Sequence, residues 1–468
     1  MRASLWGLMC PWIILLFSLM AVITVAVSPE MYVICGAVSL SLFILFCKYL
    51  YQSKQYFFFL LMPFIFPHFT AIVSNFSLET GAFIEELQVS SFATGGVTRL
   101  IFYILSFFVV AMLSFSFLNK YRINRFSLTL KGDYSRLENQ LIILFSAGIF
   151  FVLGVSAVIW GSPLLKGVQR FDYWASHPYP GIRNFLYQGY LLSFILGVYI
   201  TRLNLNYYGN KKQYIYIVAL FCFFNILYGE KFTGVFLTLL YFFVGLFGSL
   251  VLYKKIKLIT LKSVFFVSIL MLILYGLIYY QYKFIHQLPG SIFSFIESRV
   301  LNLQGEVWWA IDEMSPSGNG LSYLYSYDQN CRVTGGLYSL MYQIAPASLV
   351  DSYCERGITF TMGYPAILIS SVGYLVGYLF NLLFAVLVGV TLFLVKKAIE
   401  YPNIISLFLS AKVLLIETHA FNMGNIYNVV DAKFLIYFLL LLFFSELRLK
   451  NAQVSSHVST SISSSKTK

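Results

Sequence analysis

The segment between residues 170 and 183 holds two arginines among aromatic and titratable side chains. A planar guanidinium donates two parallel hydrogen bonds to phosphate oxygens, so Arg170 and Arg183 are candidates to grip a pyrophosphate. His177 lies between them and is a candidate substrate contact. The alternative is that both arginines simply pair with lipid headgroups. Ten residues separate Arg170 from Gly181, a spacing that chance alone produces about once in a chain of this composition.

A second candidate group lies between residues 297 and 313. Arg299 could neutralise a phosphate, and Glu306 could take a proton from a sugar hydroxyl. Gln304 and Trp308, the first of two adjacent tryptophans, are candidate sugar contacts; the alternative for Trp308 is the headgroup belt. A continuous helix would place Arg299, Glu306 and Glu313 on one face, although Gly305 weakens that expectation.

Two further cations, Lys231 and Arg356, are candidate phosphate contacts, and the sequence shows no residue spacing typical of a metal site. Lys231, in a very short connection, could reach a phosphate on a lipid carrier or simply extend to a headgroup. Arg356 is a further positive charge in the same loop as Arg299. Carboxylates and histidines are scattered without metal-ligand spacing, and no Gly-rich phosphate loop is evident, so we expect neither a metal nor a cofactor.

The cysteines fall into two groups. Cys10, Cys35, Cys47 and Cys222 lie in apolar runs, where a small apolar side chain is the ordinary role. Cys331 and Cys354 lie outside such runs, in one loop. We predict a disulfide between them, which would require an oxidising compartment such as a periplasm; two free thiols are the alternative.

The elements that must position these residues are membrane spans. The chain has 468 residues, 59% hydrophobic and 11% charged, with a mean hydropathy of +0.78. A soluble core could not bury so much apolar surface, whereas lipid accepts it. We therefore predict an all-α integral membrane protein of about twelve spans, near residues 5–27, 31–47, 56–73, 99–118, 139–160, 184–201, 214–228, 233–252, 263–282, 373–395, 404–423 and 432–446.

The distribution of charge predicts which side each loop occupies. Most of the 32 Lys and Arg residues fall in segments that alternate with the outer loops, and only four acids share those segments: Asp133, Glu138, Glu400 and Glu446. The positive-inside rule therefore places both termini in the cytoplasm, and the net charge of +13 reflects orientation and anionic headgroups rather than nucleic acid.

Three outer loops follow, at about 74–98, 161–183 and 283–372, the last a large periplasmic loop between spans nine and ten. Loops that long usually have a function, which favours an outward-facing site. Residues 1–450 form the membrane domain, and the Ser-rich tail 451–468 is predicted to be disordered and cytoplasmic. The apolar run after residue 362 is too long for one straight span, so 364–372 is predicted to be interfacial or re-entrant and to enter the tenth helix at Gly373.

Together these features resemble the Wzy-type O-antigen polymerases of Gram-negative bacteria. The resemblance is carried by the helix count, by Arg170 to Gly181, by Gly229 to Lys231 between spans, and by Gly363 to Gly373 before a late span. It covers most of the chain in topology, but its sequence motifs are loose. The chain departs from members that repeat the Arg-x10-Gly spacing in the large loop, because no arginine there has a glycine at that distance.

The resemblance implies a multi-pass enzyme of the bacterial inner membrane that acts in lipopolysaccharide biosynthesis. Such an enzyme joins oligosaccharide repeat units carried on undecaprenyl pyrophosphate at the periplasmic face. Arg170, Arg299 and Glu306 would then be catalytic, with Asp172 and His177 as the next candidates for the base. Donor and acceptor glycan lipids and the membrane are the implied partners, and contact with a chain-length regulator is left open.

Three rival functions remain at this point. A lipid-linked oligosaccharide flippase is a transporter, and such proteins are usually built from related halves; no such repeat is visible. An O-antigen ligase would use similar outer-loop residues on the same kind of donor. A membrane acyltransferase is a third, more distant alternative, suggested by Glu417 and His419.

Overall fold

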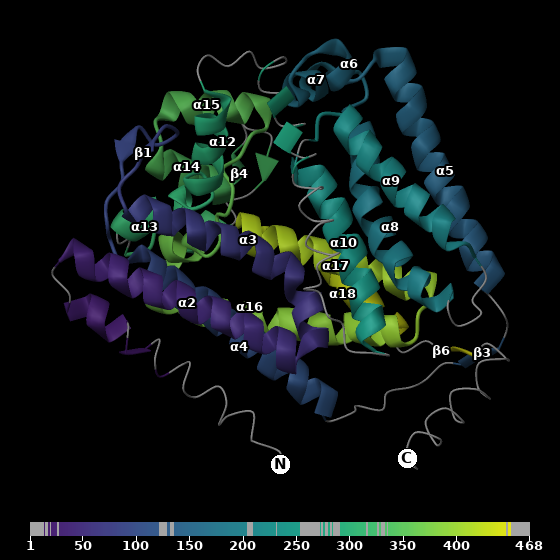
Figure 1. Cartoon of the computed structure of the whole chain (residues 1–468), viewed down its shortest axis with the longest axis horizontal. Helices are drawn as coiled ribbons and strands as arrows, with labels where there is room; N and C mark the ends of the chain where they lie inside the picture. The colour runs from purple at the N-terminus through teal and green to yellow at the C-terminus, as the bar shows by residue number, and fades with distance from the viewer. Residues whose placement is uncertain are drawn as a thin grey trace. The chain divides into compact units, whose positions relative to one another are not determined.

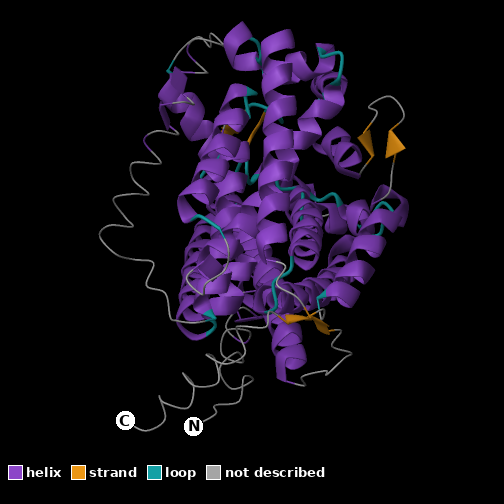
Figure 2. Ribbon diagram, turned by 90° about the vertical axis from the view of Figure 1, so that its right-hand side faces the viewer, coloured by secondary structure: helices purple, strands orange, loops and turns teal. Residues whose placement is uncertain are grey.

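The computed structural model describes residues 28–120, 129–131, 135–203, 209–230, 232–252, 291–314, 317–324, 327–328, 333–334, 336–445 and 448–450, with isolated residues between 14 and 25 and between 272 and 283. These parts are almost wholly helical, with a few strands of two or three residues (Figures 1 and 2). The chain divides into two compact units: residues 1–120, 279–392 and 414–435 form unit 1, and residues 121–278, 393–413 and 436–468 form unit 2.

Unit 1 contains the helices α2 (Pro29–Ser53), α3 (Gln55–Glu79), α4 (Gly96–Lys120), α12 (Ile292–Leu301), α13 (Glu306–Met314), η4 (Leu321–Leu324), α14 (Gly336–Ile344), α15 (Ala347–Arg356) and η5 (Ile426–Val429). Its antiparallel strand pairs are β1 (Phe83–Ile84) with β2 (Val89–Ser90), and β4 (Tyr327–Asp328) with β5 (Val333–Thr334).

Unit 2 contains α5 (Ser135–Trp160), α6 (Pro163–Lys166), α7 (Arg170–Ser176), η1 (Pro180–Ile182), α8 (Arg183–Arg202), α9 (Lys211–Leu227) and α10 (Phe232–Val251). The parallel strands β3 (Thr129–Lys131) and β6 (Arg448–Lys450) pair within it. Three helices cross the division between the units: α16 (Ala366–Glu400), α17 (Ile404–Met423) and α18 (Ala432–Phe444).

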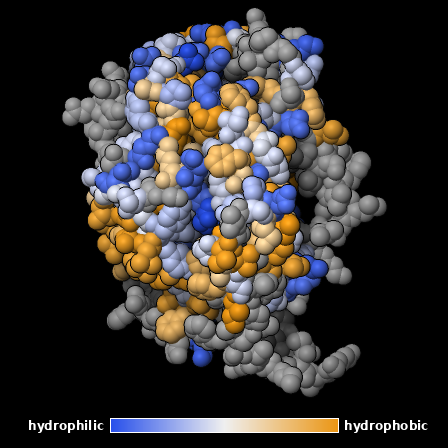
Figure 3. All heavy atoms as spheres, turned by 90° about the vertical axis from the view of Figure 1, so that its left-hand side faces the viewer, coloured by the Kyte–Doolittle hydropathy of each residue, from blue (hydrophilic) through white to orange (hydrophobic). Residues whose placement is uncertain are grey.

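The helices have the length and composition of membrane spans. Among the described residues, seven helices are long and apolar enough to cross a bilayer, namely those at 29–53, 55–79, 96–120, 136–166, 233–251, 366–400 and 404–423. Large apolar side chains are exposed on several of them, for example Leu144 and Val158 on α5 and Leu375 and Leu383 on α16. On the face in Figure 3, hydrophobic and hydrophilic side chains gather in separate regions. An all-α membrane protein accounts for these observations.

The number of spans stays a prediction. The expected spans 184–201 and 214–228 correspond to α8 and α9, which are helical but do not belong to the seven, and α18 is shorter, at 13 residues. The expected spans 5–27 and 263–282 lie almost entirely outside the described residues, as does the tail 451–468.

In unit 1, polar contacts join helices that are far apart in sequence. Helices α2, α3 and α4 pack against one another (Figure 1). Pro67 lies inside α3 and has no N–H, so the carbonyl of Pro63 one turn earlier loses its helical partner. The side-chain amide of Asn422 on α17 donates to that carbonyl at 3.0 Å, which satisfies it inside the helix bundle.

Residues 297–313 do not form one continuous helix, so Arg299, Glu306 and Glu313 do not share one helix face. Helix α12 ends at Leu301, a turn covers 302–305, and α13 begins at Glu306. A Cβ at Gly305 would overlap the backbone of Asn75 on α3, and the Asn75 amide donates to the Gly305 carbonyl at 3.2 Å. The close approach of the two backbones requires glycine, and it redirects the chain so that α13 packs on α3 and α4.

The predicted break at Gly373 is confirmed. This residue has φ +75° and ψ 173° inside α16, which separates a short helix from a long one. The short helix ends with carbonyls that accept hydrogen bonds from neighbouring backbone: Ser370 from Asn319 at 2.9 Å and Ser371 from Gly320 at 2.7 Å. Its depth in a membrane stays a prediction.

In unit 2, polar contacts form at the two opposite ends of the helices. At one end, Glu138 at the start of α5 accepts from Tyr199 at 2.8 Å and from the Ile404 N–H at 3.1 Å. At the same end, Arg202 donates to the Ile399 carbonyl at 2.7 Å. The other end carries the connections from α5 to α8 and from α9 to α10, where most of the candidate residues of this unit lie.

Candidate functional site

Arg170 and Arg183 converge on one carboxylate. Arg170 at the start of α7 forms an ion pair with Glu230, and Arg183 at the start of α8 donates to the other oxygen of Glu230 at 3.2 Å. Glu230 follows α9, so three connected segments of unit 2 meet here. The two arginines predicted to act together are therefore neighbours.

The local backbone explains why Glu230 turns towards the arginines. Gly229 has φ +71°, a conformation that side chains other than glycine rarely adopt, and the chain reverses there between α9 and α10. A Cβ at Gly229 would lie 3.2 Å from the Cβ of Arg170 and 3.3 Å from that of Pro163. Glycine therefore permits both the turn and the close packing of the arginine segment against it.

The charges of this cluster do not cancel. One carboxylate faces two guanidinium groups, which leaves one excess positive charge. The Glu230 side chain is only 6% exposed, whereas those of Arg170 and Arg183 are 23% and 30% exposed. The carboxylate therefore orients the arginines from the protein side, while part of each guanidinium faces outward. The Arg183 Nε–H is buried and has no hydrogen-bond partner.

Aromatic rings support the same guanidinium groups. The Arg170 Cζ lies 4.5 Å from the centre of the Phe171 ring, and the Arg183 Cζ lies 5.7 Å from that of Tyr187. These distances suit cation–π attraction, which stabilises a cation without neutralising it. The arrangement can bind an anion with two or more oxygens, such as a phosphate or pyrophosphate.

His177 packs beneath this cluster rather than in it. Its Nδ1 accepts from the Tyr179 N–H at 3.0 Å, and its ring contacts Trp160, Tyr173 and Trp174. Burial lowers the pKa of His177 below its usual value, so the ring is neutral at neutral pH. This environment favours a structural role for His177 over the predicted contact with substrate.

A second cluster, in unit 1, contains the predicted residues Arg299 and Glu306. Glu306, at the start of α13, is 1% exposed and hydrogen-bonds to Glu86 from the β1–β2 turn. The Tyr353 hydroxyl on α15 donates to Glu86 Oε1 at 3.0 Å. Burial, and then the neighbouring Glu86, hold the pKa of Glu306 well above its usual range, although Arg299 opposes this effect.

Trp308 does not present its ring to a ligand. It is 2% exposed, and its indole N–H donates to the Gly96 carbonyl at 2.8 Å, while that of Trp309 donates to Phe92 at 3.0 Å. Trp308 therefore anchors α13 to the start of α4, and the predicted sugar stacking does not fit this burial. The physical reason is that α13 packs its apolar face inward instead of lying on the loop surface.

The same helix carries an ion pair that the sequence analysis did not single out. Arg99 binds both carboxylate oxygens of Asp312 at 2.6 Å, and Thr94 and Tyr374 donate to that carboxylate at 3.1 and 2.9 Å. Asp312 is buried, so removing one partner would leave an uncompensated charge. This network fixes α13 between α4 and α16.

The other predicted residues are dispersed. Gln304 is half-buried in the 302–305 turn, and Arg356 is exposed at the end of α15. Lys231 and Cys331 lie outside the described residues. Cys354 is disulfide-bonded, but its predicted pairing with Cys331 stays a prediction.

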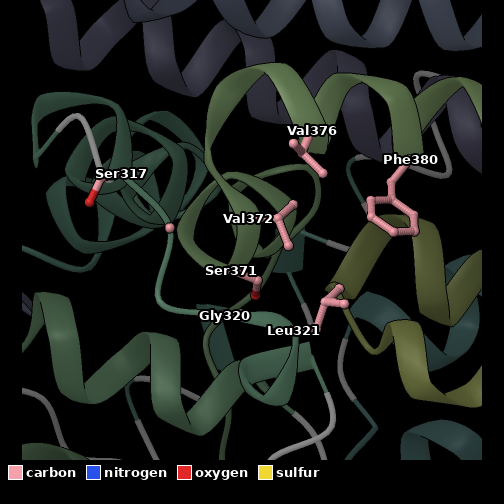
Figure 4. Close-up of a pocket in the computed structure, with 8 residues that line it drawn as sticks. Ser317, Gly320, Leu321, Ser371, Val372, Val376 and Phe380 are labelled. Carbon is pink, nitrogen blue, oxygen red and sulfur yellow. The ribbon is translucent and has the colours of Figure 1, made fainter.

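A cavity of about 360 Å³ lies beside the Gly373 break. In Figure 4, Val372, Val376 and Phe380 of α16 face the same space as Leu321. Ser317, Ser371 and the backbone of two glycines complete the lining, which has no charged side chain. The cavity therefore suits an apolar group and offers nothing that would neutralise a phosphate.

Residues 332–438 match a family of unknown function (DUF6418). That range covers α14 to most of α18, including the Gly373 break and Cys354, but none of the Arg170, Arg183 and Glu230 cluster. No curated protein matches the chain. No solved structure matches it either.

Sequence reasoning found the cations but missed their acidic partners. Glu230 was visible only as part of a short connection between two spans, and Glu86 lies in a loop that offered no motif. A signal existed for Glu230: an acidic residue at the end of a span must have a partner, and loop arginines on the same side were available. Glu86 had no comparable signal, because its contact with Glu306 joins segments 220 residues apart.

Proposed function

We propose that this chain is an O-antigen polymerase, a glycosyltransferase that joins oligosaccharide repeat units carried on undecaprenyl pyrophosphate at the periplasmic face of the bacterial inner membrane. The observation that carries the proposal is the pair of partly exposed arginines, Arg170 and Arg183, fixed on the buried Glu230. Fixed positive charge is what a pyrophosphate leaving group requires when its bond to a sugar breaks.

In the proposed reaction, the cluster of Arg170, Arg183 and Glu230 handles the leaving group. Arg170 and Arg183 bind the pyrophosphate of the donor lipid and stabilise the negative charge that develops on it. The acceptor sugar hydroxyl attacks the anomeric carbon of the donor, loses its proton to a base, and displaces the pyrophosphate with the electron pair of the broken bond. Positive charge that the protein already holds in place lowers the barrier, because no solvent dipoles have to reorient as the negative charge develops.

The topology supports an outward location for this chemistry. The segments 74–98 and 283–372 are both predicted to be outer loops, and the described parts of the two are in contact. Trp309 donates to the Phe92 carbonyl, and the Asn75 side chain donates to the Gly305 carbonyl. The cytoplasmic position of both termini belongs to the same proposal and rests on the positive-inside rule.

The test is a surface-polysaccharide gel of a deletion strain complemented with variants of this chain. The wild-type chain should restore a ladder of repeat units, whereas the deletion strain should carry core with a single repeat unit. Arg170→Ala and Arg183→Ala should each weaken the ladder about 100-fold or more, the usual effect of removing one group that stabilises transition-state charge. Lys212→Ala, an exposed cation at the opposite end of unit 2, is the matched control and should behave as wild type.

The same gel separates the alternatives. A deletion strain with no repeat unit on the core would contradict the proposal and indicate a flippase or a ligase. Full ladders from both arginine variants, at protein levels equal to wild type, would remove the cluster from the site.

A further inference from the structure

The carboxyl pair of Glu86 and Glu306 is built from segments that are distant in the sequence. Glu86 lies in the turn between β1 and β2, and Glu306 starts α13. Their side chains are hydrogen-bonded, and the Tyr353 hydroxyl donates to Glu86 Oε1 at 3.0 Å. Two carboxyl groups can share a hydrogen bond only when one of them carries the proton.

The two carboxyls differ in their access to solvent. Glu306 is 1% exposed, and its Oε2 is buried without a hydrogen-bond partner. Glu86 is half-buried and lines a cavity of about 30 Å³ together with Glu85, Arg299 and Asn302. That volume holds one or two water molecules, or a hydroxyl group, but not a sugar ring. A hydroxyl that enters this cavity therefore meets Glu86 and Arg299, with Glu306 behind them.

The protonation of the pair follows from the same asymmetry. Burial, reinforced by the neighbouring Glu86, keeps the pKa of Glu306 well above its usual range. Glu306 thus keeps its proton at neutral pH and donates it in the hydrogen bond to Glu86. A protonated carboxylic acid cannot accept another proton, so the buried member of the pair is unsuited to act as the base that the sequence analysis assigned to it.

We propose that Glu86, rather than Glu306, is the base that takes the proton of the acceptor hydroxyl, and that Glu306 positions Glu86 by a hydrogen bond from its carboxylic acid. This inference rests on the proposed function. The acceptor O–H proton moves to a Glu86 carboxylate oxygen, and the hydroxyl oxygen forms a bond to the anomeric carbon. The bond from that carbon to the pyrophosphate oxygen breaks, and the pyrophosphate leaves with the electron pair.

Four groups surround Glu86 and set its charge environment: Glu85, Arg299, Tyr353 and Glu306. Arg299, exposed on α12, lines the same cavity and supplies positive charge near the carboxylate. Tyr353 donates a hydrogen bond and is a second positioning residue. Burial, and then the adjacent Glu86, raise the pKa of Tyr353, so its hydroxyl stays protonated and remains a donor.

The test uses the purified full chain in lipid nanodiscs with a synthetic undecaprenyl-pyrophosphate repeat unit. Single-turnover formation of the dimeric product is measured for Glu86→Gln, Glu306→Gln, Glu306→Ala and the control Glu355→Gln, an exposed carboxylate on α15 that does not line the cavity. Glu86→Gln should slow product formation about 100-fold or more, with substrate affinity unchanged. Glu306→Gln keeps an N–H donor and should retain most activity, whereas Glu306→Ala should lose it; this rescue would not follow from a purely structural role.

The outcomes are distinguishable. The inference is overturned by a Glu86→Gln variant as active as Glu355→Gln, or by a Glu306→Gln variant as inactive as Glu86→Gln. Glu86→Asp keeps a carboxylate, and its activity above that of Glu86→Gln would show that Glu86→Gln fails through chemistry and not through misfolding. A wild-type chain that forms no dimeric product fails the proposed function itself, whatever the variants do.

Discussion

At the scale of single residues, Glu230 controls the position of two guanidinium groups. Its carboxylate is buried, and each of its oxygens faces a different arginine. A neutral amide in its place would turn an NH2 donor, which cannot accept a hydrogen bond, towards one of the arginines and would leave two like charges side by side. The geometry of the cluster therefore depends on a residue that would touch no substrate.

We expect Glu230→Gln to weaken donor binding and slow repeat-unit joining, because Arg170 and Arg183 lose the group that holds them together. In the nanodisc assay, the donor concentration that gives half-maximal rate should rise about tenfold or more. Glu355→Gln, which makes the same change at an exposed carboxylate on α15, is the control and should be nearly silent. Equal behaviour of the two variants would contradict the orienting role of Glu230.

At the scale of elements, α3 tolerates a proline because another helix compensates for it. Pro67 removes one N–H, and Asn422 of α17 supplies a donor to the orphaned Pro63 carbonyl. Two glycines also permit contacts or turns that a side chain would prevent. Gly305 lies against the backbone of Asn75 in the turn after α12, and Gly373 interrupts α16. The unusual residues inside apolar runs are thus explained by their contacts with other helices.

Replacing Asn422 by Leu should lower stability by about 1 kcal/mol, because the Pro63 carbonyl would be left without a donor inside the bundle. Thermal unfolding of the detergent-solubilised chain measures the change. Asn428→Leu, a half-buried asparagine on η5, controls for the loss of an amide in general. A midpoint for Asn422→Leu equal to that of the control would show that the Pro63 carbonyl needs no side-chain partner.

At the scale of the whole molecule, the polar contacts gather at the ends of the helices in each unit. In unit 2, one end carries Arg170, Arg183 and Glu230, and the other carries Glu138 and Arg202 with their backbone partners. In unit 1, the described parts of the 283–372 loop pack on the ends of α3 and α4 beside residues 80–95. The alternation of ends along the chain is what a multi-pass protein requires.

The orientation can be measured with an impermeant thiol reagent on intact cells. We expect cysteines introduced at Gln88 and Asp172 to react from outside, and one at Lys212 to react only after the inner membrane is opened. The background retains Cys331 and Cys354 and replaces the other four cysteines by serine. Labelling of the Lys212 position in intact cells would reverse the proposed topology.

The sequence by itself determined the class of the protein, because apolar runs long enough to cross a bilayer have few other stable fates. It also identified Arg170, Arg183, Arg299 and Glu306 as candidates, since charged groups in outer loops are few and conspicuous in so apolar a chain. Its expectation of a helix break at Gly373 is confirmed, because the apolar run there exceeds one span.

Only the tertiary structure decided which of these residues meet and which are buried. The Glu230 and Glu86 contacts, and the inward rotation of Trp308, depend on packing between segments up to hundreds of residues apart. Hydrophobic periodicity fixes one face of a helix, but several partners can cover that face with similar energy. Burial then sets the protonation of Glu306, so tertiary packing and not sequence distinguishes the two carboxyl groups as candidate bases.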